Sequence, residues 1–195
     1  LLASASADRT VRLWAVRGGT GAPVQTLRSH AAAVTSVAFS PDGTLLASAS
    51  FDGTVKLWAV QTGVLLQTLR GHASWVIAVA FSPDGTLLAS AGEDGTVKLW
   101  NIQDGTLRQS ITGHAAEVTA VAFSPDGATL ASASADNTVK LWALQGREPV
   151  RIFSGHTASV TAVIFSPDWQ TLASTGEDGT VKLWDVQTGV PVRTF

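Results

Sequence analysis

The chain has 195 residues, of which 45% are hydrophobic and 14% charged, and these proportions exclude a disordered protein. The formal net charge of −2 and the scattered Lys and Arg residues argue against nucleic-acid binding. Cysteine is absent, which excludes a disulfide framework and favours the reducing cytoplasm. No apolar stretch approaches the roughly 20 residues of a membrane span, so we predict no membrane association.

A period of 42 residues runs through the sequence, because four histidines and four tryptophans each recur at that interval. Self-similarity of this kind is the signature of a repeat fold. A further tryptophan, Trp14, lies 44 residues before Trp58. The two additional residues fall in the glycine-rich segment 17–22, which is predicted to be a loop.

Each period is predicted to contain four short strands. In the period that begins with His30, β-rich segments are separated by typical turn sequences such as Ser40-Pro41-Asp42-Gly43. The predicted strands are 34–39, 45–50, 54–60 and 64–69. Four strands joined by tight turns form an antiparallel meander, and no helical periodicity is visible.

Both faces of such a sheet carry Val, Leu, Ala, Phe and Trp, which neighbouring sheets must cover. Radial packing of similar sheets covers them and leaves only short edges, as in a propeller. The pairs Gly71-His72, Gly113-His114, Gly155-His156 and Trp184-Asp185 resemble the signatures of the WD-repeat (WD40) β-propeller family. The uniform copies resemble bacterial, including cyanobacterial, members. Two departures are Ser29 in place of glycine and the residue after Trp in the other copies, which is Ala15, Ala59, Asn101 or Ala143.

The resemblance implies an all-β propeller segment of four-stranded antiparallel blades, four of them complete and one without its innermost strand. Propellers of this family usually close with about seven blades, so we expect an excised or partial propeller that belongs to a larger ring. Its open blade ends would then favour self-association. The expected limits within this one domain are 1–28 for the partial blade and 29–70, 71–112, 113–154 and 155–195 for the complete blades.

His, Ser, Asp and Trp recur in every full period at fixed offsets. Ser, His and Asp suggest nucleophilic catalysis, but an active site occurs once and this set occurs four times without an oxyanion-donor loop. We therefore predict no enzyme. The resemblance implies a structural tetrad in which Asp holds His, His holds Ser and Ser holds the indole N–H. The four sets are His30, Ser48, Asp52 and Trp58; His72, Ser90, Asp94 and Trp100; His114, Ser132, Asp136 and Trp142; and His156, Ser174, Asp178 and Trp184.

The same residues predict neither a metal site nor a cofactor site. Histidines 42 residues apart come from different blades, and no pair has the close spacing of metal ligands. The glycines fall in turns between strands rather than in a phosphate-binding loop. We expect no cofactor.

Positions at which the copies differ are not needed to build the blades, so they are the candidates for binding. The resemblance places the loop before the first strand and the turn after the second strand on one face, called the top face. The candidate residues there are Phe51, Trp75, Glu93, Glu117 and Glu177. Aromatic rings beside carboxylates suit a Lys- or Arg-bearing peptide, although the rings could instead only lean on neighbouring loops. On the opposite face Trp169 replaces a turn glycine, and we predict a different turn there.

The sequence favours a protein-interaction scaffold whose partner is a protein or a peptide, with a basic peptide preferred. One alternative is a sensor or regulatory repeat domain of a larger signalling NTPase or kinase, by analogy with similar arrays. Another is a repeat protein constructed for folding studies, which the absence of Cys and Met encourages.

Overall fold

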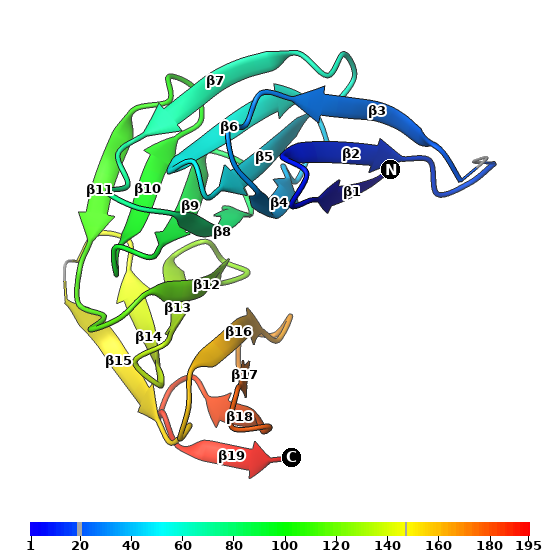
Figure 1. Cartoon of the computed structure of the whole chain (residues 1–195). Helices are drawn as coiled ribbons and strands as arrows, with labels where there is room; N and C mark the ends of the chain where they lie inside the picture. Colours follow the sequence, from blue (N-terminus) through cyan, green and yellow to red (C-terminus); the bar gives the residue numbers. More distant parts are fainter. Residues whose placement is uncertain (19–20, 147) are drawn as a thin grey trace.

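The computed structural model describes residues 1–18, 21–146 and 148–195. Within these residues it contains nineteen β-strands and no helix, arranged as five antiparallel sheets in which strands pair in sequence order. The sheets follow one another along an open arc, and the two chain ends lie on either side of the opening (Figure 1). The all-β prediction is confirmed, as is the prediction of one three-stranded sheet followed by four four-stranded sheets.

We call the sheets blades 1 to 5. Blade 1 consists of β1 (Leu2–Ala5), β2 (Thr10–Trp14) and β3 (Pro23–Arg28). Blade 2 consists of β4 (Val34–Phe39), β5 (Leu45–Ser50), β6 (Thr54–Ala59) and β7 (Leu65–Arg70). Blade 3 consists of β8 (Val76–Phe81), β9 (Leu87–Gly92), β10 (Val97–Asn101) and β11 (Leu107–Ile111). Blade 4 consists of β12 (Val118–Phe123), β13 (Thr129–Ser134), β14 (Thr138–Ala143) and β15 (Pro149–Ser154). Blade 5 consists of β16 (Val160–Phe165), β17 (Thr171–Gly176), β18 (Val181–Asp185) and β19 (Pro191–Thr194). Residues 19 and 20 of the predicted 17–22 loop lie outside the described residues.

Hydrophobic side chains between neighbouring blades form the core, in four clusters that repeat the same positions. Between blades 2 and 3, Ala47, Ala49 and Leu57 of one sheet pack against Leu88 and Trp100 of the next. The small alanines make room for the indole ring, and all five side chains are at most 2% exposed. Each blade thus covers one face of the blade that follows it, which is why the apolar repeat requires stacking.

The innermost strands of adjacent blades are also joined by threonine side chains. A β-bulge removes Thr35 from the pairing of β4 with β5, and its hydroxyl donates instead to the Val76 carbonyl of blade 3 at 2.8 Å. Thr119 makes the equivalent bond from blade 4 to the Val160 carbonyl of blade 5. Ile77 occupies the equivalent position in blade 3 and has no hydroxyl to donate.

The turns between the first and second strands share one hydrogen-bonded form. In blade 2, the Ser40 hydroxyl donates to Asp42 Oδ1 at 2.6 Å and accepts from the Leu45 N–H at 2.9 Å. Gly43 then adopts a left-handed φ of 71°, and its N–H donates to the Ser40 carbonyl at 2.9 Å.

The prediction of a different turn at Trp169 is wrong. Trp169 adopts a φ of 59°, and its N–H donates to the Ser166 carbonyl at 3.0 Å, as the glycine does elsewhere. The bonds of Ser166 with Asp168 and with the backbone of Thr171 are also present. These bonds hold the backbone in the shared form despite the steric preference of a residue with a Cβ.

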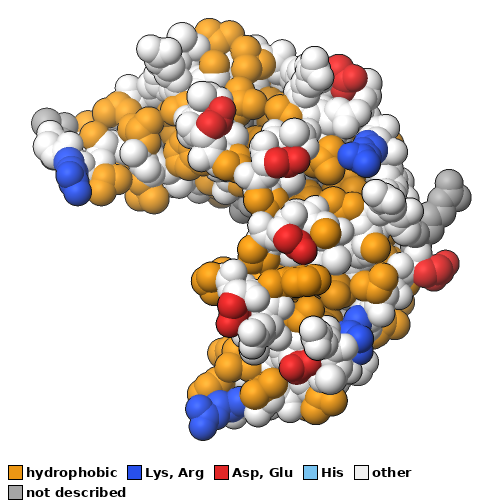
Figure 2. All heavy atoms as spheres, turned by 180° about the vertical axis from the view of Figure 1, so that it is seen from behind, with side chains coloured by type: hydrophobic (Ala, Val, Ile, Leu, Met, Phe, Trp, Pro, Cys, Tyr) orange, Lys and Arg blue, Asp and Glu red, His pale blue; other side chains and the backbone are white. Residues whose placement is uncertain are grey.

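The two ends of the arc expose apolar side chains. Leu2 and Val16 are 58% and 71% exposed on blade 1, and Val181 and Phe195 are 38% and 62% exposed on blade 5. Among the described residues, no strand of blade 5 pairs with a strand of blade 1. On the face seen in Figure 2, acidic side chains occur singly among hydrophobic and uncharged ones, and basic side chains lie toward the ends and the outer edge.

Candidate functional site

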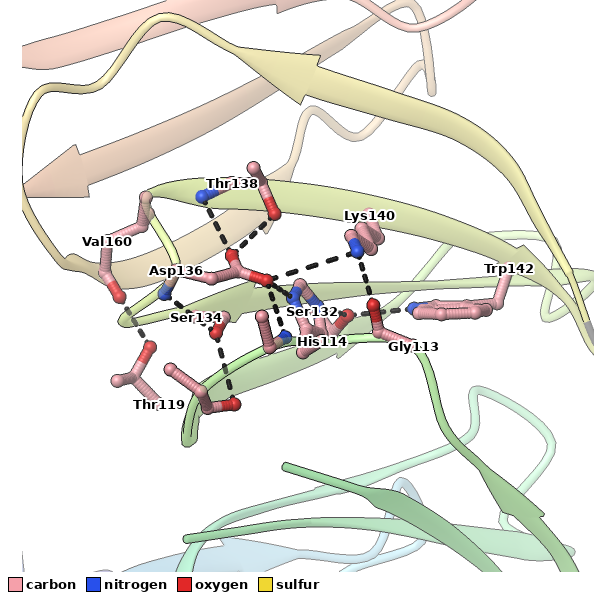
Figure 3. A network of polar contacts seen from close by, with 12 residues as sticks. Gly113, His114, Thr119, Ser132, Ser134, Asp136, Thr138, Lys140, Trp142 and Val160 are labelled. Carbon is pink, nitrogen blue, oxygen red and sulfur yellow. Dashed lines mark hydrogen bonds and ion pairs between the residues drawn. The ribbon is translucent and has the colours of Figure 1, made fainter. Parts of the chain in front are cut away.

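The four residue types of each tetrad lie within hydrogen-bonding distance of one another, as Figure 3 shows for blade 4. His114, in the loop before β12, places Nδ1 2.8 Å from Asp136 Oδ2 and Nε2 2.7 Å from Ser132 Oγ. The Trp142 indole N–H donates to the same Ser132 oxygen at 2.8 Å. The corresponding contacts in blades 2, 3 and 5 measure between 2.7 and 3.1 Å.

The direction of these hydrogen bonds follows from the donor inventory. A carboxylate only accepts, so His114 donates from Nδ1 to Asp136 and accepts at Nε2 in its neutral form. The Ser132 hydroxyl therefore donates to His114 and accepts from the indole of Trp142, which is donor only. A second proton on the imidazole would turn Nε2 into a donor and leave the buried Ser132 hydroxyl hydrogen without its acceptor. The network thus selects the neutral imidazole.

Each aspartate also ties two loops together. Asp136 Oδ1 accepts from the Thr138 N–H at 3.0 Å and from the Thr138 hydroxyl at 2.6 Å, while Oδ2 accepts from the Ala115 N–H at 3.1 Å. Our sequence analysis did not single out these threonines. The signal was present, since Thr occurs two residues after this Asp in all five copies: Thr10, Thr54, Thr96, Thr138 and Thr180.

Burial shifts the titration of the tetrads. It lowers the pKa of His30, His72 and His114, and the facing carboxylates raise that pKa only in part. Burial also raises the pKa of Asp52 and Asp136, but their hydrogen bonds from Thr, the backbone and His outweigh it and lower the pKa to about 2. Asp52 and Asp136 are therefore ionised and His30, His72 and His114 neutral near pH 7.

The hydrogen bonds of each tetrad resemble those of a catalytic triad, but the tetrad serine is not exposed to solvent. The serines Ser48, Ser90, Ser132 and Ser174 are at most 1% exposed. Each serine oxygen also accepts from a tryptophan indole N–H, so it is both buried and already hydrogen-bonded. In the part of the chain that the structure describes, no group of three or more His, Cys, Asp or Glu residues could hold a metal ion.

In blade 1, Ser4, Asp8 and Trp14 occupy the serine, aspartate and tryptophan positions of the tetrad. The Trp14 indole N–H donates to Ser4 Oγ at 2.9 Å. Asp8 bonds to Thr10 and also pairs with Arg12. Among the described residues, Ser4 therefore has one tetrad partner, the Trp14 indole, where its equivalents have two.

The structure brings two of the five predicted binding residues into direct contact. Phe51, in the turn after β5, stacks on Trp75, in the loop before β8, with ring centroids 4.5 Å apart and ring planes 30° from parallel. The rings are 37% and 47% exposed. They line a groove of about 400 Å³ together with Arg70, Ser74 and the tetrad loops.

The three predicted glutamates lie at separate places. Glu93 is exposed beside the aromatic pair, where its N–H donates to the Trp75 carbonyl at 2.9 Å and its carboxylate accepts from the Ser74 hydroxyl. Glu117 is half-buried in the loop before β12, and Glu177 is exposed in blade 5 beside Ser159. The structure therefore groups Phe51, Trp75 and Glu93 and leaves Glu177 two blades away.

The tetrad serine should carry a large share of blade stability. Ser90→Ala leaves the buried Trp100 N–H and His72 Nε2 without partners, at about 1–3 kcal/mol each. We expect the free energy of unfolding in urea to fall by about 2–6 kcal/mol. Ser4→Ala, which removes a single partner in blade 1, is the matched control and should cost clearly less. Equal losses would contradict the network.

Acidification should destabilise the chain in two steps. The pKa of His30, His72 and His114 lies below the ordinary 6.5, so their stabilisation is present above pH 6.5 and is lost as the pH falls toward the folded pKa. Asp52 and Asp136 add a loss as the pH falls from 3.8 toward about 2. Urea melts between pH 8 and pH 2.5 measure both steps. Stability that rises between pH 6.5 and pH 5 would exclude buried neutral histidines.

Five segments of the chain match the family described as WD domain, G-beta repeat: residues 1–15, 21–59, 63–101, 105–143 and 147–185. The match over 21–59 includes β3, the outer strand of blade 1, and ends with β6, the third strand of blade 2. The sequence repeat therefore connects two blades.

A mouse protein, the F-box-like/WD repeat-containing protein TBL1X of Mus musculus, is 58% identical over 43 residues. This alignment covers 22% of the chain and 8% of the mouse protein. In the described residues, no helix is long and apolar enough to cross a membrane. WD repeats generally mediate protein–protein interaction, and the proteins that contain them are typically non-enzymatic scaffolds. With five matched repeats along its length, this chain belongs to the WD-repeat (WD40) family.

Proposed function

We propose that this chain is a non-enzymatic scaffold that presents the rigid top face of its blades to a protein or peptide partner. The stacked Phe51–Trp75 pair is the observation that carries the proposal. The other copies have Ala, Glu or Ser at the position of Trp75, so a blade forms without an aromatic residue there. Large, partly exposed aromatic side chains dominate the energy of protein interfaces.

The buried tetrads support a structural rather than a catalytic role. Each of the four serines shares its oxygen between an imidazole and an indole, and all four are inaccessible. Their bonds fix the loop before the first strand to the turn after the second strand, and these are the loops that carry Trp75 and Phe51. A rigid frame under the rings reduces the entropy lost on binding.

The surroundings of the aromatic pair favour a basic, extended peptide. Glu93 lies beside Trp75. Glu117 is the residue of blade 4 that corresponds to Trp75 of blade 3, so the repeat places it against blade 3 as Trp75 lies against blade 2. Two carboxylates next to an aromatic pair suit a Lys or Arg side chain. Arg70 also lines the groove and can donate to the backbone carbonyls of such a peptide. The absence of cysteine supports a site of action in the cytoplasm.

The open ends support self-association of the 195-residue polypeptide. Val181 and Phe195 lie on the face of blade 5 that, in the preceding blades, is buried against the next blade. Leu2 and Val16 are exposed at the opposite end of the arc. We expect light scattering to show association that weakens upon Phe195→Ser. A strictly monomeric chain with unchanged behaviour in the variant would contradict this expectation.

The top face is tested with a peptide selected from a random library on the immobilised chain. We expect Trp75→Ala to weaken binding by roughly 2 kcal/mol or more, because the indole is a central contact. Glu117→Lys should mainly slow association at low salt, because rim charges steer the encounter. Surface plasmon resonance separates the two effects. Unchanged affinity of Trp75→Ala would move the binding surface away from the aromatic pair.

A further inference from the structure

Trp169 is an aromatic residue in a conformation that favours glycine. It lies in the turn between β16 and β17, where blades 2, 3 and 4 have Gly43, Gly85 and Gly127 with φ between 69° and 71°. The turn is the same in all four blades, so the tryptophan does not serve to build it. A side chain in this backbone region costs conformational energy that glycine avoids, and such strained residues concentrate at functional sites.

The indole lines a groove on the face opposite the tetrad loops, because the turn follows β16 whereas the tetrad histidine precedes it. Trp169 is 38% exposed. The groove has a volume of about 500 Å³, and its lining residues are Asp168, Trp169, Gln170, Asp185, Val186 and Gln187. The Val186 N–H donates to the Gln170 carbonyl at 3.0 Å and ties the two walls of the groove together.

Two carboxylates give the groove a negative charge. Asp168 uses Oδ1 to accept from the Ser166 hydroxyl at 2.6 Å and from the Gln170 N–H at 3.1 Å. Asp185 uses Oδ1 to accept from the N–H and the hydroxyl of Thr188 at 2.7 and 2.8 Å. Among the described residues, no hydrogen bond reaches Oδ2 of either carboxylate.

Hydrogen bonds from Ser166 and from the Gln170 backbone lower the pKa of Asp168. Hydrogen bonds from Thr188 lower the pKa of Asp185, and the positive charge of nearby Arg151 lowers it further. Both groups are therefore ionised near pH 7. Arg151 lies near Asp185 and offsets part of its charge, whereas the causes of the lowered pKa of Asp168 include no cationic side chain.

We propose that the Trp169 groove is a second docking site, on the face opposite the Phe51–Trp75 pair, for an extended arginine-bearing segment of a partner protein. A guanidinium is planar and can stack on the exposed indole while its N–H groups pair with Asp168. A lysine ammonium lacks that shape, and a phosphate or an acidic peptide would be repelled. The site goes beyond the proposed top-face function and does not depend on it.

Fluorine NMR of the chain labelled with 5-fluorotryptophan tests the proposal directly. The chain contains seven tryptophans, so each site gives its own signal, and Trp169→Phe assigns the one of interest. The probe is the blocked peptide acetyl-Gly-Ser-Arg-Ser-Arg-Ser-Gly-amide. A peptide with citrulline in place of both arginines is the matched control, since it keeps the shape and removes the charge.

We expect the Trp169 signal to move on addition of the arginine peptide and the signals of the buried tetrad tryptophans to stay in place. The citrulline peptide should bind at least tenfold more weakly. Asp168→Asn retains the turn acceptor and removes the charge, so it should weaken binding several-fold without a change in melting temperature. Trp75→Ala, on the other face, should leave the titration of the Trp169 signal unchanged.

Three results would overturn the proposal: a Trp169 signal that does not move, equal binding of both peptides, or full affinity in folded Asp168→Asn. A shift confined to the Trp75 signal would also overturn it, while leaving the top-face function intact. Loss of arginine-peptide binding in Trp75→Ala alone would also overturn the proposal and leave the top-face function intact.

Discussion

Burial of apolar side chains between neighbouring sheets is the constraint on which the rest of this structure depends. A four-stranded blade has two hydrophobic faces, and each interface pairs a face of small residues, such as Ala47 and Ala49, with a face that carries Trp100. This complementarity sets the direction of stacking, because only a tryptophan face fits the alanine face. A 42-residue sequence with both faces can therefore be repeated without change, and the arc grows by one blade each time.

The tetrads convert stacked sheets into a surface with fixed loops. Tryptophan belongs both to the inter-blade core and to the hydrogen-bond network, since the indole of Trp142 packs against blade 3 and donates to Ser132. Its neighbours in the network, His114 and Asp136, hold the backbone of the loops on the top face. Packing and polar contacts thus depend on one another, and a fault in the network also loosens the blade interface.

The sequence was sufficient for the parts of the molecule that repeat. Turn residues and β-rich segments at a constant period indicated the strands and the sheet order, and the family resemblance implied that the recurring His, Ser, Asp and Trp form a tetrad. The sequence was insufficient where an outcome depends on competing local energies. At Trp169 the steric preference of the side chain predicted a new turn, but the bonds of Ser166 and Asp168 retained the old one. The sequence also could not predict the contact between Phe51 and Trp75, because this contact depends on side-chain rotamers in two neighbouring blades.

Because the blades repeat, a residue that differs from its equivalents in the other blades can be recognised as unnecessary for the fold. When four copies of a turn or a loop show which residues the fold needs, a departure such as Trp75 or Trp169 is not explained by the fold. Both departures are aromatic and partly exposed, and they lie on opposite faces of the arc. Trp169 in addition keeps a left-handed backbone that glycine would adopt at lower cost. A rigid array with one aromatic site on each face could hold two segments at a fixed separation, which a single blade cannot do.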